Sequence, residues 1–141
     1  MAYKRVIRFQ YFRIRCRRFR NGQWGENKET FNLVDLIMKI RSKEMILKNV
    51  EFDKVLARVE KVTHVEEEDV WGIRFMKLRD TNIPSTVKTN QEAEPIELDD
   101  DEYIGEDLTM IYERKSSVAM IQANRFSLGI SRLEDFLNKL Y

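Results

Sequence analysis

The chain has 141 residues, about the length of one domain. Its 43% hydrophobic and 11% aromatic content is too rich for wholesale disorder, and 35% charged residues with two prolines and five glycines exclude collagen-like and low-complexity classes. The net charge of +1 excludes no class of partner, because basic and acidic residues occupy different stretches of the chain. We expect a single domain over residues 1–141.

The first predicted element is a strand over residues 3–19, where apolar and basic residues alternate. The apolar residues of this strand occupy odd positions within residues 7–11 and even positions within residues 12–16. This change at Tyr11-Phe12 predicts a β-bulge that lets both groups of apolar residues face one core. The Asn-Gly pair at residues 21–22 then predicts a turn.

A helix is predicted over residues 32–45, because apolar residues recur there at the spacing of one helical face. Asn32 has the chemistry of an N-cap. Two strands follow, residues 53–65 and 70–79, and the acidic stretch 66–69 between them indicates the turn of a long hairpin.

Residues 80–95 lack periodicity, and we expect a mobile surface loop there. A second hairpin is predicted from residues 107–113 and 117–124. A final helix is predicted with Ser131 and Glu134 as a capping box. Its apolar stripe is Leu133, Phe136, Leu137 and Leu140. This order of elements predicts an α+β domain with a largely antiparallel sheet of about five strands and two helices.

The basic N-terminal strand is the most informative segment for function. If its apolar residues face the core, Arg13, Arg15 and Arg17 stand on the opposite face, about 6.6 Å apart. Arginine forms bidentate hydrogen bonds with phosphates and carboxylates, so this row predicts contact with nucleic acid or an acidic protein. Neighbouring aromatic rings would stack on unpaired bases. The candidate binding residues are Arg13, Arg15, Arg17, Arg18, Tyr11 and Trp24.

Two alternatives to this binding role remain open. One is that the arginines protect an edge strand from aggregation, and the other is that they pair with the acidic stretches of the same chain. Residues 92–107 contain nine acidic residues and no basic one, and residues 66–69 are wholly acidic. Residues 99–102 do not have the spacing of a calcium-binding loop, so we expect a solvated acidic loop without a metal.

Few residues offer catalytic chemistry. Cys16 is the only cysteine and His64 the only histidine, and we expect His64 to face solvent beside the acidic turn. Phosphate-binding glycine loops, nucleophile elbows and zinc spacings are absent from the sequence. Glu113 and Lys115, following Asp107, suggest a magnesium-dependent nuclease as a third interpretation. We expect a non-enzymatic cytoplasmic protein without cofactor, and no membrane partner, because no apolar run approaches about 20 residues.

The final helix offers a second possible interaction surface. About nine helical residues are too few to be stable alone, so the apolar stripe needs a surface to cover. That surface is either the chain's own sheet or a partner, such as a second copy or an effector protein. The stripe Leu133, Phe136, Leu137 and Leu140 is therefore a possible interface for an assembly module.

Four short stretches of the second half share a recognisable pattern: residues 74–79 (RFMKLR), 82–84 (NIP), 101–106 (DEYIGE) and 120–125 (MIQANR). Together they resemble the amino-terminal part of an uncharacterised family of bacteria and their mobile elements. The resemblance implies that related chains are often longer and that some belong to phage-defence systems. It further implies a recognition part whose effector is absent or lies on another polypeptide. The first twenty residues lie outside the resemblance.

Overall fold

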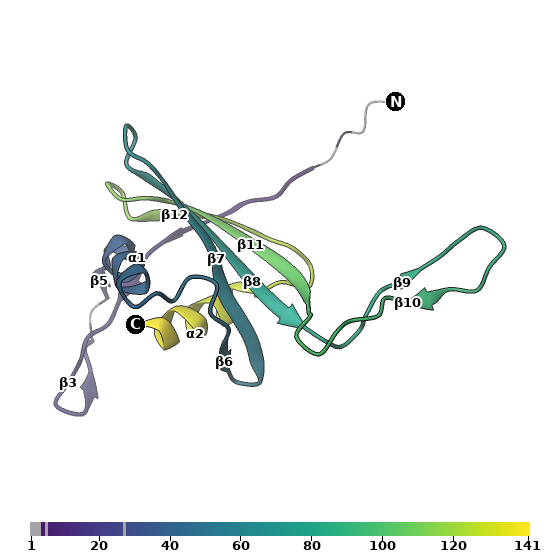
Figure 1. Cartoon of the computed structure of the whole chain (residues 1–141). Coiled ribbons are helices and arrows are strands. Elements are labelled where there is room, and N and C mark those ends of the chain that lie inside the picture. The colour runs from purple at the N-terminus through teal and green to yellow at the C-terminus, as the bar shows by residue number, and fades with distance from the viewer. Residues whose placement is uncertain (1–3, 5, 27) are drawn as a thin grey trace.

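The structure is a computed structural model that describes residues 4, 6–26 and 28–141. Its main feature is a six-stranded sheet in the order β1-β12-β11-β8-β7-β6, in which neighbouring strands are antiparallel (Figure 1). The strands are β1 (Gln10–Arg13), β6 (Val50–Phe52), β7 (Val55–Val65), β8 (Val70–Arg79), β11 (Ile104–Glu113) and β12 (Val118–Ala123). The predicted α+β class with a largely antiparallel sheet is confirmed.

Two helices, α1 (Leu33–Ser42) and α2 (Ile130–Leu140), pack on one face of this sheet (Figure 1). Side chains from both helices join inward-facing residues of the strands in one core, including Phe75, Met110 and Tyr112. In the described part of the chain, neither helix has the length and apolar content that crossing a membrane requires.

The start of α1 is fixed by a cap and by a tether to the sheet. The Asn32 side chain accepts a hydrogen bond from the Val34 backbone N–H at 3.1 Å, as predicted for an N-cap. The buried hydroxyl of Tyr112, in β11, accepts one from the Leu33 N–H at 3.2 Å. This bond satisfies a donor that the first turn of a helix leaves without an internal partner. The helix ends at Ser42, three residues earlier than expected.

The helix α2 directs its apolar stripe into the core of its own chain. Leu133, Phe136 and Leu140 are buried, and Leu137 is half-buried. The structure therefore places the three buried side chains of the possible interface away from the surface. The predicted capping box is wrong, because the N-cap is Gly129, and Ser131 and Glu134 both lie inside the helix.

The predicted bulge at Tyr11-Phe12 is also wrong. The register of β1 against β12 runs without a shift from Gln10 to Arg13, and residues 6–9 are exposed. The apolar residues change from odd to even positions at the point where the chain joins the sheet. A bulge occurs instead in β7, between Val59 and Lys61.

Two hairpins were missing from the sequence prediction. The strand β6 precedes β7, and the connecting residues Asp53 and Lys54 both have positive φ, 44° and 63°. Residues 80–103 form a projecting arm that contains β9 (Ser85–Thr86) paired with β10 (Glu94–Pro95), where an irregular loop was expected (Figure 1). We call residues 80–103 the acidic arm, because they include eight acidic residues and one basic residue.

Candidate nucleic-acid interface

The predicted N-terminal strand is split into β1 and the outgoing side of a two-stranded ribbon. The ribbon pairs β2 (Arg15–Cys16) with β5 (Glu29–Thr30), and β3 (Phe19–Arg20) with β4 (Gln23–Trp24). We call residues 15–30 the basic ribbon. It projects beyond α1 at one end of the molecule (Figure 1).

The tip of the basic ribbon is a tight turn that the sequence predicts correctly. Asn21 and Gly22 both have positive φ, 51° and 75°. Asparagine and glycine tolerate this left-handed region best, and two such residues match the twist of a two-residue hairpin. The turn therefore folds the chain back and pairs Phe19 with Trp24.

The candidate arginines all point into solvent. Arg13, Arg15, Arg17 and Arg18 are exposed, while Phe12, Ile14 and Cys16 between them are half-buried. Arg18 pairs with Glu29 of the same ribbon at 2.8 Å. Among the described residues, no ion pair involves Arg13, Arg15 or Arg17. These three exposed cations thus have no counter-charge among the described residues.

The aromatic candidates occupy two different places. Trp24 is 65% exposed at the ribbon tip, where its ring lies 5.0 Å from that of Phe19, itself 58% exposed. Tyr11 lies in β1, opposite Met120 of the main sheet, and is 69% exposed. The structure brings Phe19 and Trp24 together, while Tyr11 belongs to the open face of the sheet.

A second basic element adjoins β1 and was missed by the sequence analysis. A cavity of about 430 Å³ lies between the chain before β1 and the end of β12. Arg8 and Arg125 both line it, together with Gln122 and Asn124. Arg125 is far from the basic strand in sequence, so no local pattern joins it to Arg8. Cationic side chains thus follow the N-terminal segment from this cavity to the ribbon tip.

The basic and acidic segments do not neutralise one another in the described structure. No ion pair among the described residues joins residues 4–20 to residues 92–107. Arg74 pairs instead with Asp107 on the open face of the sheet, at 2.9 Å. The hydrogen bond and the charge of Asp107 raise the pKa of Arg74 above its usual range. Arg74 is therefore held as a cation beside Asp107, and it is paired within the sheet.

The candidate catalytic residues are dispersed. His64 does not face solvent as expected: it is half-buried, its ring stacks on Trp71 at 3.9 Å, and its Nε2 lies 3.1 Å from Asp69. Glu113 accepts a hydrogen bond from Ser116 at the β11–β12 turn. Across residues 4, 6–26 and 28–141, no three His, Cys, Asp or Glu side chains are grouped to hold a metal ion.

Comparison with known proteins gives a family and no further relative. No curated protein and no solved structure matches the chain. A family model matches residues 1–141, so the match includes the first twenty residues that the sequence resemblance left out. The chain belongs to the family of unknown function DUF6731.

Proposed function

We propose that the protein is a non-enzymatic binding module that contacts single-stranded nucleic acid through its basic ribbon and β1. The observation that carries this proposal is the projecting ribbon itself, with an exposed pair of aromatic rings at its tip and exposed arginines along its edge. Residues 15–30 contain five basic and two acidic residues.

Arginine and aromatic side chains have complementary roles in such an interface. Cations that follow a backbone neutralise phosphates without reading sequence. Exposed rings stack on unpaired bases, and each stacked base contributes about 1–3 kcal/mol. A ring buried in the core could not do this, so the exposure of Trp24 is central to the proposal.

The path of the interface follows the N-terminal segment. Figure 1 shows this segment running along the sheet from the N-terminal side to the ribbon. Arg8 and Arg125 line the cavity before β1, Arg13 lies in β1, and Arg15 lies in the ribbon. We propose that a nucleic-acid backbone follows this series of cations.

The test is a titration of fluorescently labelled single-stranded and duplex oligonucleotides at low salt, read by anisotropy. The variant that changes Arg13, Arg15 and Arg17 to Glu should abolish binding. A matched variant with Lys48, Lys54 and Lys88 changed to Glu has the same net charge and should still bind. Those exposed residues lie elsewhere: Lys48 and Lys54 flank β6, at the sheet edge opposite β1, and Lys88 lies in the acidic arm. Equal binding by the wild type and the arginine variant would contradict the proposal.

A second variant separates stacking from charge. Trp24→Ala should weaken single-stranded binding by about 1–3 kcal/mol and affect duplex binding less. Because Trp24 is exposed, the variant should fold normally. An equal loss for both substrates would argue against base stacking. The association with bacterial phage defence and with an effector protein stays a prediction from the sequence resemblance.

A further inference from the structure

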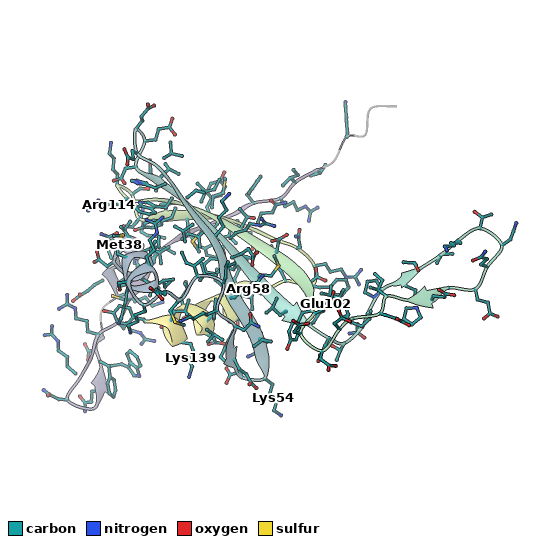
Figure 2. The ribbon with its side chains drawn as sticks, viewed as in Figure 1. Met38, Lys54, Arg58, Glu102, Arg114 and Lys139 are labelled. Atoms are coloured by element: carbon teal, nitrogen blue, oxygen red, sulfur yellow. The ribbon has the colours of Figure 1, made fainter. Side chains whose placement is uncertain are left out.

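A cavity of about 310 Å³ lies at the base of the acidic arm, where the arm leaves the sheet. Its lining combines apolar side chains with carboxylates: Ile96, Leu98 and Tyr103, with Asp99, Asp100 and Glu102. Figure 2 shows Glu102 at this base, at the end of the sheet away from Arg114. The cavity thus offers apolar contact and negative charge at one place.

The walls of this cavity are held by defined contacts. Arg79, at the end of β8, donates to Glu106 at 2.8 Å and to the Thr81 carbonyl at 2.7 Å. The backbone N–H of Ile96 bonds to the Pro84 carbonyl at 3.0 Å, which joins the two sides of the arm. The turn that carries the carboxylates is closed by the Glu102 N–H on the Asp99 carbonyl, also at 3.0 Å. These contacts fix the backbone around the cavity.

This lining favours a ligand that carries a positive charge next to an aromatic or aliphatic group. Carboxylates prefer guanidinium groups, and the neighbouring apolar side chains gain most from contact with a large flat ring. The basic ribbon of this same chain has that chemistry at its tip: Phe19 and Trp24 are exposed, and Arg17 and Arg20 lie on either side of Phe19 in the sequence.

The ribbon and the acidic arm of one molecule project from opposite ends of the sheet (Figure 1). No ion pair in the described part of the chain connects them. We propose that the tip of the basic ribbon docks into the cavity at the base of the acidic arm of a second copy of this chain. The ribbon tip of one molecule would contact the arm cavity of the next, so the two surfaces in each contact are different. Such a contact is head-to-tail and builds rings or open chains.

Charge complementarity argues for a second copy as the occupant. The ribbon has five basic residues against two acidic ones, and the arm has eight acidic residues against one basic one. Every molecule carries both surfaces, so the matching partner is present at the same concentration as the protein. The proposal goes beyond nucleic-acid binding, because self-association of this kind needs no nucleic acid.

The test is sedimentation velocity of nuclease-treated protein over a range of concentrations. At about 0.05 M salt, the wild type should sediment faster as its concentration rises, and at about 0.5 M salt this dependence should disappear because exposed charges are screened. Trp24→Ala should weaken the association about tenfold, as expected for an aromatic anchor. Met38→Ala, which removes an exposed side chain of α1, should leave it unchanged.

Charge reversal makes the test specific to the two surfaces. Changing Arg17 and Arg20 to Glu, or Asp99 and Asp100 to Lys, should each leave a monomer. One chain that carries both reversals has the wild-type net charge and should associate again. Restored association would support the docking. Either a monomeric wild type at low salt, or a doubly reversed chain that stays monomeric while the wild type associates, would overturn it.

The same variants separate this inference from the proposed function. The variant with Asp99 and Asp100 changed to Lys should still bind single-stranded oligonucleotide, because it leaves the ribbon intact. If it binds nucleic acid and the wild type does not self-associate, the docking is wrong and the proposed function stands. If the wild type self-associates without binding nucleic acid, the docking stands and the proposed function is wrong.

Discussion

Removal of the Phe136 side chain should destabilise the monomer itself. Phe136 is fully buried, and its ring stacks on Phe52 at 5.2 Å and meets Phe75 edge-on at 6.1 Å. The side chain therefore joins α2 to both β6 and β8. Phe136→Ala leaves a cavity among these rings and removes both aromatic contacts.

The size of the effect follows from this burial. Truncating a buried phenylalanine to alanine costs about 3–5 kcal/mol. A domain of this length loses about 3 °C in Tm for each kcal/mol, so the expected fall is roughly 9–15 °C. The free energy of unfolding of a natural domain is about 5–15 kcal/mol, so this loss is a large fraction of the total and is readily measured.

Thermal unfolding followed by circular dichroism at several protein concentrations measures this. The fall in Tm should be the same at every concentration, because the contacts lie within one chain. Glu134→Ala on the exposed side of the same helix is the control and should change stability by at most about 0.5 kcal/mol. A Tm that rises with concentration in the wild type, and no longer does so in Phe136→Ala, would show that the stripe of α2 serves an interface.

Three further predictions concern the tether, the cap and the absence of catalysis. Tyr112→Phe should lower the free energy of unfolding, measured by chemical denaturation, by about 1–3 kcal/mol, because it leaves a buried backbone N–H of α1 without a partner. The same change at exposed Tyr11 should leave the free energy of unfolding unchanged. Asn32→Ala should cost about 0.5–2 kcal/mol, and a smaller loss would mean that its cap bond is not formed in solution. Incubation with DNA or RNA in Mg²⁺ or Mn²⁺ should give no cleavage; turnover that disappears in Glu113→Ala or Lys115→Ala would favour the nuclease interpretation instead.

The elements that the sequence predicts well are those with strong periodicity. The helix α1 has an apolar face and a capping asparagine, and β7 and β8 alternate around an acidic turn. Local side-chain pattern and turn chemistry suffice for such elements. These segments then fix most of the core, and the α+β class follows from their order.

The missed features depend on backbone geometry that side-chain pattern does not reveal. The turn between β6 and β7 uses Asp53 and Lys54 with positive φ, where Asn-Gly or Asp-Gly is the usual signal. The bulge in β7 moves His64 to the side of the sheet that carries Trp71, so simple alternation gave the wrong face.

The candidate site was predictable in part for the same reasons. The alternation of half-buried residues with Arg13, Arg15 and Arg17 is visible in the sequence, and so is the turn at Asn21-Gly22. Chain folding alone brings Arg8 and Arg125 to one cavity. Contacts between residues that are distant in sequence depend on the whole sheet, and no short pattern predicts them.

The salt dependence of oligonucleotide binding is the most direct measure of whether Arg13, Arg15 and Arg17 contact phosphates. Neutralising three phosphates on a single strand predicts a slope of about −2 in a plot of log affinity against log salt concentration, and each single change among Arg13, Arg15 and Arg17 to Ala should reduce its magnitude by about 0.7. We expect this stepwise decrease, with the folded structure unchanged. A slope that is the same in the wild type and in all three single variants, or no binding of the wild type at low salt, would contradict it.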